Sequence, residues 1–311
     1  MVSNRRRKQP QEYLIKCVVY DDGIRPVREA KPHSADKLTI LAAYLPAFTK
    51  ASAKAPHRYF VDALAGPGLY HFSSGGSATG ALVEGKFVKG STLIARDTKP
   101  QFDCILAMDI DAKNVDALRR RTEGDERVVV KRGDCNEDLI PFMEAELEDR
   151  LAPVFVFVDP EGFEVEWSTI ERLSRFRQGP KKTELLIYFA APSLARFNLE
   201  GVQQYTMNVD RAMPPGREWR SLLSKAKERS ASGKEIADEM VKHYAGALQN
   251  VLEYGHVTCR AIGPSGPDDR GGPVFYYLVY ATDFVPTSNE GPMDWIFANL
   301  WGSSSSQAKL F

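Results

Sequence analysis

The sequence predicts an α/β fold with an open, mostly parallel sheet. Five apolar runs alternate with segments of helical periodicity: residues 59–61, 104–108, 128–130, 154–158 and 184–189. Runs that are continuously apolar, as these are apart from Glu184 at the start of the fifth, are typical of strands covered by helices on both faces. An acid follows each of the first four runs: Asp62, Asp109, Asp134 and Asp159. Because ligands of such sheets bind beyond the carboxyl ends of the strands, we expect the site at this edge.

A glycine pair follows the first strand. Asp62 is separated by three residues from Gly66-Pro67-Gly68. This D-x-x-x-G-x-G spacing is the nucleotide-loop pattern of S-adenosylmethionine (SAM)-dependent methyltransferases, whereas His71 stands where the dinucleotide fingerprint needs a small residue. We expect four residues around this loop to bind SAM: Asp62, Ala65, Gly66 and Gly68. Asp62 would accept hydrogen bonds from the ammonium group. An ordinary strand-to-helix turn is the alternative.

The next two acids suit the nucleoside part of SAM. Asp109 ends the second strand, where the acid of a dinucleotide fold accepts from the ribose hydroxyls. Asp134 follows the third strand, and we expect it to meet the exocyclic amine of adenine. For both residues the alternative is a helix N-cap, where Asp stabilises a helix by about 1 kcal/mol. Residues 134–138 contain several candidates for such a cap.

Asp159-Pro160-Glu161-Gly162-Phe163 follows the fourth strand, where amine-methylating enzymes carry an acid or amide, two prolines and an aromatic residue. We expect Asp159, the carbonyl of Pro160 and Glu161 to orient or deprotonate the methyl acceptor. Phe163 would stack on a flipped base. The sequence departs from the pattern, because Glu161 replaces the second proline and Phe163 comes one place late. A type I or II turn at Pro160 is the alternative.

Residues 1–32 are expected to form an irregular N-terminal arm. A helix then begins at Ser34 or Asp36 and ends at Pro46. Residues 71–89 are too rich in glycine for a packed element and suggest a mobile loop beside the cofactor, with a lid as one candidate role. Gly90-Ser91 begins the next helix.

Residues 33–196 should form the SAM-binding core, and residues 197–255 a helical insert. Apolar residues at i, i+4 spacing, from Ile236 to Leu248, indicate one helix of this insert. The insert is either a nucleic-acid reader with basic flanks or a cap over the substrate cleft. Residues 256–302 should return as an antiparallel hairpin and a helix that complete the core, and residues 303–311 form a flexible tail.

Composition indicates a chain long enough for a full hydrophobic core. Among its 311 residues, 41 Lys and Arg balance 41 Asp and Glu, so no net charge attracts nucleic acid. The four cysteines form no C-x-x-C pair, and we expect reduced thiols and no metal site. No apolar run has membrane-spanning length and no signal-peptide pattern is present, so we expect a cytoplasmic location.

Several of these segments resemble the three-Cys-motif partner proteins. The resemblance rests on Lys37-Leu38, Tyr44-Leu45, the glycine loop with Tyr70, Gly90-Ser91, Phe157 to Gly162 with Trp167, and Tyr276 to Ala281. It implies a class I methyltransferase fold with SAM as cofactor and a helical, winged-helix-like segment. It also implies a protein partner, because the three cysteines of the family name belong to a separate protein.

We therefore expect a SAM-dependent methyltransferase that acts on a base of RNA or DNA. The alternative is a non-catalytic binding module that keeps the fold to present a surface to its protein partner. The acids and glycines of the first two strand ends favour the enzyme, whereas the departure at Glu161 favours the module. A dinucleotide oxidoreductase is disfavoured by His71 and by the long gap between Gly68 and Asp109.

Overall fold

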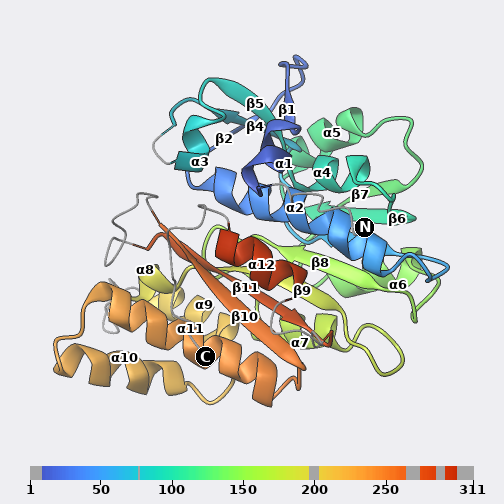
Figure 1. Ribbon diagram of the computed structural model, residues 1–311. Coiled ribbons are helices and arrows are strands. Elements are labelled where there is room, and N and C mark those ends of the chain that lie inside the picture. Colours follow the sequence, from blue (N-terminus) through green and yellow to red (C-terminus); the bar gives the residue numbers. More distant parts are fainter. Residues whose placement is uncertain (1–8, 76–77, 196–202, 264–273, 285–290, 300–311) are drawn as a thin grey trace, which may run out of the picture.

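The computed structural model describes residues 9–75, 78–195, 203–263, 274–284 and 291–299; the expected tail at 303–311 lies outside them. Its centre is a seven-stranded sheet in the order β10-β11-β9-β8-β3-β6-β7 (Figure 1). Five strands are parallel: β3 (Tyr59–Asp62), β6 (Cys104–Asp109), β7 (Val128–Arg132), β8 (Val154–Val158) and β9 (Glu184–Phe189). The others, β10 (His256–Ile262) and β11 (Tyr276–Thr282), form an antiparallel hairpin beside β9. The predicted fold class is confirmed.

The central residues of the parallel strands are apolar because helices cover both faces of the sheet. In β8, alternate side chains point to opposite faces: Val154, Val156 and Val158 lie in one core cluster, Phe155 and Phe157 in another. Helices α2 (Ser34–Ala51) and α12 (Pro292–Asn299) cover the phenylalanine face (Figure 1). The valine face packs against α6 (Leu139–Glu146), α7 (Trp167–Ser174) and α11 (Gly233–Asn250).

Helix α2 continues to Ala51, so its predicted end at Pro46 is wrong. A proline within a helix removes one N–H donor and crowds the preceding turn. Here the next turn is held by Phe48, whose ring lies 5.8 Å from that of Phe102 and 5.7 Å from that of Phe155. Packing against the sheet thus outweighs the local signal for termination.

A second, four-stranded sheet takes up two segments that were expected to be irregular (Figure 1). Its strands, in order, are β1 (Val18–Val19), β5 (Lys86–Lys89), β4 (Leu69–Phe72) and β2 (Arg28–Glu29). The mobile loop expected at 71–89 is wrong, because β4 and β5 pair with each other and a short helix, α3 (Ala78–Ala81), lies between them. The arm is also partly ordered into α1 (Gln11–Ile15), β1 and β2.

One buried arginine fixes this arm to the core. Arg121 ends α5 (Ala112–Arg121), and its side chain is only 2 % exposed. Its guanidinium pairs with Asp22 at 2.7 Å and donates to the carbonyls of Ile24 at 2.6 Å and Pro26 at 3.0 Å. A further bond, of 2.7 Å, reaches the carbonyl of Pro67 in the glycine loop. These bonds hold the arm, and with it β2, against the loop.

Helices connect β9 to β10, in agreement with the predicted insert: α8 (Ala191–Ala195), α9 (Gln203–Ala212), α10 (Glu218–Glu228) and α11. A capping box begins α11, in which Ser232 Oγ accepts from Glu235 N and Glu235 Oε2 accepts from Ser232 N. The predicted apolar face of α11 is buried: Ile236, Met240, Tyr244 and Leu248. In the described part of the chain, no helix combines the length and apolarity needed to cross a membrane.

Candidate functional site

A cavity of about 400 Å³ lies at the carboxyl ends of β3, β6, β7 and β8. Four predicted site residues line it: Asp109, Asp134, Asp159 and Glu161. The other predicted site residues are outside this lining: Asp62, Ala65, Gly66, Gly68, Pro160 and Phe163. The cavity is at the edge of the sheet where open α/β folds bind their ligands.

Asp109 connects the glycine loop to the end of β6. Its Oδ2 accepts from Gly66 N at 2.8 Å, and its Oδ1 accepts from Asp111 N at 2.8 Å and Asn114 Nδ2 at 3.2 Å. The N-cap of α5 is Asp111, which accepts from Lys113 N, so Asp109 is not the cap. Because a carboxylate oxygen can accept two hydrogen bonds, Oδ2 retains capacity for one donor in the cavity.

Asp134 lies in the turn before α6. Its Oδ1 accepts from Asn136 N at 2.8 Å, whereas no described residue donates to its Oδ2. The cap position of α6 is Asp138, and Asp134 donates to that side chain through its own backbone N at 2.9 Å. Asp134 therefore presents one carboxylate oxygen to a ligand.

Asp62 is buried at the end of β3 and does not line the cavity. Its Oδ2 accepts from Thr92 Oγ1 at 2.7 Å, in the first turn of α4 (Ser91–Asp97). Burial raises the pKa of Asp62 to about 7, and the hydroxyls of Ser91 and Thr92 oppose that rise. This side chain attaches α4 to the sheet instead of pointing at the cavity.

Packing accounts for the second glycine of the loop. Gly68 has a φ of +87°, and a Cβ there would lie 2.6 Å from Leu118 Cδ1. Gly66 has a φ of +61°, a backbone angle that residues other than glycine rarely adopt. Ala63 and Leu64 form the cavity wall at this loop, whereas the next residue, Ala65, is buried.

Asp159 forms an ion pair with Lys37, a residue that sequence analysis did not place in the site. Lys37 Nζ lies 2.8 Å from Oδ1 and 2.6 Å from Oδ2 of Asp159. The two side chains are 8 % and 4 % exposed, so the pair is nearly removed from water. Each oxygen of Asp159 can accept one more hydrogen bond while the pair stays intact.

Arg28 brings a positive charge to the cavity. Its Nη2 donates to Glu161 Oε1 at 2.6 Å, and the side chain of Glu161 is 76 % exposed. Its Nη1 lies 3.9 Å from the point where a Cβ on Gly66 would be. Its guanidinium carbon lies 5.9 Å from the ring centroid of Tyr70. No periodic pattern marks Arg28 in the sequence, because its position follows from the pairing of β2 with β4.

Phe163 lies in the core, where its ring packs edge-on against Phe189 at a centroid distance of 6.0 Å. It is 7 % exposed, so it does not offer a stacking surface in this structure. Tyr188 lies nearer the ion pair, with its ring centroid 5.5 Å from Lys37 Nζ. Burial raises the pKa of Tyr188 to about 12, and the charge of Asp159 adds to that rise.

Four rings connect this point to the protein surface: Tyr188, Tyr276, His33 and Phe275. We call them the aromatic row. Successive ring centroids are 4.5, 5.6 and 4.7 Å apart. Phe275, at the outer end, is 42 % exposed. The row therefore runs from the lysine–aspartate pair to solvent.

The cavity lining is acidic. It contains one arginine, Arg28, and six carboxylates: Asp109, Asp111, Asp134, Asp159, Glu161 and Glu164. Such a lining favours a cationic ligand and disfavours a phosphate group. Within the described residues, no cluster of His, Cys, Asp or Glu side chains is arranged to hold a metal ion.

No protein-family model matches the sequence, and no curated protein matches it. Several solved structures are similar to this one. A DUF519 protein from Legionella pneumophila is 9 % identical, with a TM-score of 0.50 over 88 % of this chain and 94 % of that one. An O-methyltransferase from Bacillus cereus in complex with S-adenosylhomocysteine (SAH) is 12 % identical, with a TM-score of 0.42 over 90 % and 93 % of the two chains. Human methyltransferase-like protein 13, also with SAH, is 12 % identical, with a TM-score of 0.41 over 86 % and 90 %.

At such low identity the likeness shows the fold alone. The mostly parallel seven-stranded sheet with a terminal antiparallel hairpin is the Rossmann-like α/β architecture that the sequence predicted. The three-Cys-motif partner family does not appear among the proteins named above, so that resemblance stays a prediction.

Proposed function

We propose that the chain is a SAM-dependent methyltransferase that acts on a base of RNA or DNA. The observation that carries this proposal is the cavity at the strand ends, whose lining offers a candidate polar group for each part of SAM. Asp109 would accept from the ribose hydroxyls, and Asp134 from the adenine amine, each through Oδ2. Arg28 would hold the carboxylate of the methionine part, and the acidic lining suits the ammonium and sulfonium charges.

When bound, SAM supplies an electrophilic methyl group on its sulfonium. The residues of this chain would orient the methyl acceptor. Orientation would supply most of the barrier reduction, because methyl transfer from a sulfonium needs little covalent help from the protein. Asp159 would accept a hydrogen bond from the acceptor amine, and the carbonyl of Pro160 is a second candidate acceptor. Lys37 would fix the carboxylate of Asp159 in place and balance its charge. Glu161 would act on the cofactor side, because it pairs with Arg28.

The aromatic row supports a nucleic-acid base as the acceptor. Unstacked bases bind proteins by stacking on aromatic side chains, and bases that are methylated leave the helical stack. In this proposal Tyr188, next to the ion pair, takes the place expected for Phe163. Phosphate groups would remain outside the acidic cavity.

Calorimetry with SAH tests the cofactor assignment. Asp134→Asn keeps an oxygen for Asn136 N and replaces Oδ2 with an amide donor. We expect this variant to bind SAH about 10- to 100-fold more weakly, the range for a hydrogen bond to a charged group, with an unchanged melting temperature. It should also lose the preference for SAH over S-inosylhomocysteine, which carries an acceptor in place of the adenine amine. If the wild-type chain gives no heat with SAH, the assignment is wrong.

Transfer of labelled methyl groups to RNA, DNA or protein tests the acceptor. Because the resemblance leads us to propose a partner with a three-cysteine motif, the assay is run with and without that partner. The proposal is supported if RNA or DNA becomes labelled and if the Asp134→Asn variant transfers less label than the wild-type chain. Label in protein alone overturns the acceptor class. Intact SAH binding with no label anywhere favours the non-catalytic binding module.

A further inference from the structure

A second cavity lies at the other end of the sheet, and the proposed function does not use it. Its volume is about 290 Å³, near the lower end of the range for small-molecule sites. Its apolar lining comes from α2, α12 and the segments before β8 and after β11: Ala47, Phe48, Ala51, Pro153, Phe284, Pro292 and Met293. Strand β8 separates Pro153 from Asp159, so roughly 20 Å of strand lies between the two cavities.

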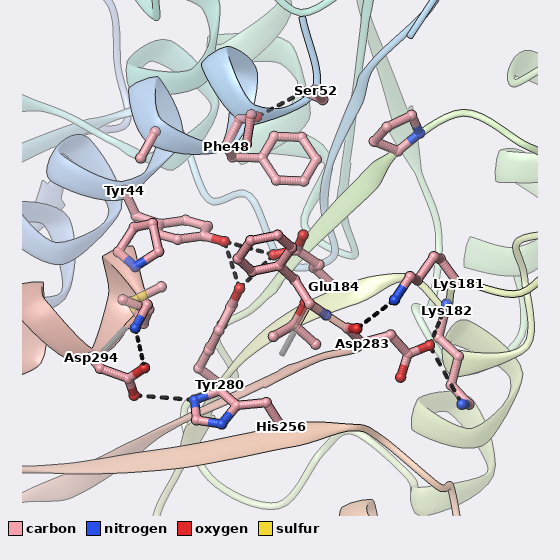
Figure 2. Close-up of a pocket in the computed structure, with 18 of the residues that line it drawn as sticks. Tyr44, Phe48, Ser52, Lys181, Lys182, Glu184, His256, Tyr280, Asp283 and Asp294 are labelled. Carbon is pink, nitrogen blue, oxygen red and sulfur yellow. Dashed lines mark hydrogen bonds and ion pairs between the residues drawn. The ribbon is translucent and has the colours of Figure 1, made fainter. Parts of the chain in front are cut away.

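Three polar side chains meet in this cavity (Figure 2). The hydroxyls of Tyr44 and Tyr280 each lie 2.6 Å from Glu184 Oε2, to which they donate, and 2.5 Å from each other. No described residue donates to the other oxygen, Oε1. Glu184 is half-buried, in contrast to the buried tyrosines. Phenol groups donate hydrogen bonds to a carboxylate but do not cancel its charge. Oε1 therefore remains free to accept a hydrogen bond, and Glu184 keeps its negative charge.

Burial raises the pKa of Glu184, whereas the two hydroxyls and the charge of Arg177 oppose that rise. Arg177 donates to backbone through Nη1 to Lys182 O at 3.2 Å and through Nη2 to Leu151 O at 2.6 Å, whereas no described residue accepts from its Nε. Glu184 makes no ion pair with any residue in the described part of the chain.

The other charged groups around the cavity already have partners. Lys181 Nζ donates to the carbonyl of Asp283 at 2.8 Å, and Lys182 Nζ lies 3.5 Å from its carboxylate. His256 Nε2 lies 3.1 Å from Asp294 Oδ1. A positively charged ligand would therefore pair with the carboxylate of Glu184.

We propose that this cavity binds a small organic amine, with its ammonium group on Glu184 Oε1 and its apolar body against Phe48, Pro153 and Met293. A positive charge there would balance a half-buried carboxylate, which is costly to leave unpaired. A role limited to joining α2, β9 and β11 needs neither the free oxygen nor the apolar cavity.

Calorimetric titration with 2-phenylethylamine tests the proposal, and 2-phenylethanol is the neutral ligand of matched shape. We expect the wild-type chain to bind the amine about 10- to 100-fold more tightly than the alcohol. Glu184→Gln should remove this preference. Glu228→Gln, at an exposed position of α10, is the matched control, and Asp134→Asn should leave amine binding unchanged because it alters only the other cavity.

A second variant protects the test against a folding defect in Glu184→Gln. Ala47→Trp keeps the carboxylate and fills the cavity, so it should abolish binding of the amine. The proposal is overturned if the wild-type chain does not bind the amine, if it binds the alcohol equally well, or if amine binding persists in Ala47→Trp.

Discussion

Lys37 Nζ contacts both carboxylate oxygens of Asp159, at 2.8 and 2.6 Å, and this ion pair joins α2 to the end of β8 across 122 residues of sequence. The pair is nearly buried, and the ring of Tyr188 lies beside the ammonium group. The residue proposed to orient the acceptor is thus also part of the packing between a helix and the sheet.

Breaking this pair should destabilise the fold. We expect Lys37→Met and Asp159→Asn each to lower the free energy of unfolding by roughly 3–5 kcal/mol, because each leaves a nearly buried charge without its partner. The double variant should lose less unfolding free energy than the two single variants lose together, as measured by urea denaturation. Glu171→Gln, which breaks the exposed pair with Arg175, is the control and should cost less than about 1 kcal/mol. Additive losses would contradict a coupled pair.

Replacing Arg28 should affect only ligands that carry the amino-acid part of SAM. We expect Arg28→Met to weaken SAH binding about 10- to 100-fold, because the carboxylate loses a charged donor. Binding of 5′-methylthioadenosine, which lacks that part, should be unchanged. Arg120→Met, at an exposed position of α5, is the control. Equal losses for the two ligands would show that Arg28 acts through the fold of the cavity.

The raised pKa of Asp62 should make stability depend on pH. Its pKa is about 7 in the folded chain, against an ordinary value of 3.8. Between these values the folded chain holds a proton that the unfolded chain releases, so the contribution of Asp62 to stability falls as pH rises from about 4 to 7. Asp62→Asn should therefore gain stability relative to the wild-type chain across this interval, by up to about 4 kcal/mol. Parallel curves of unfolding free energy against pH would contradict the shift.

Removing the outer ring of the aromatic row should weaken binding to single strands. We expect Phe275→Ala to lose roughly 1–3 kcal/mol in affinity for a labelled oligonucleotide, the range for stacking one base. Fluorescence anisotropy measures this loss. Phe284→Ala removes another exposed ring, which lines the second cavity, and serves as the control. If both variants bind like the wild-type chain, the row does not contact nucleic acid.

The sequence by itself determined the sheet and the edge at which the cavity lies. The apolar runs from Tyr59 to Phe189 predict buried parallel strands, and the acids that end them must share one edge because parallel strands end on the same side. The spacing from Ile236 to Leu248 likewise predicts the buried face of α11. These features depend on local periodicity, which a sequence displays directly.

Only the tertiary structure decided which side chains meet. Local signals show neither that Lys37 pairs with Asp159 nor that Arg28 lines the cavity, because both contacts join segments more than 100 residues apart. The strands of the small sheet have two or four residues each, too few to display an alternating pattern. Asp62 and Phe163 have the residue types of a site but lie in the core. A residue type shows what a side chain can do, whereas packing decides whether it faces a partner, a ligand or the interior.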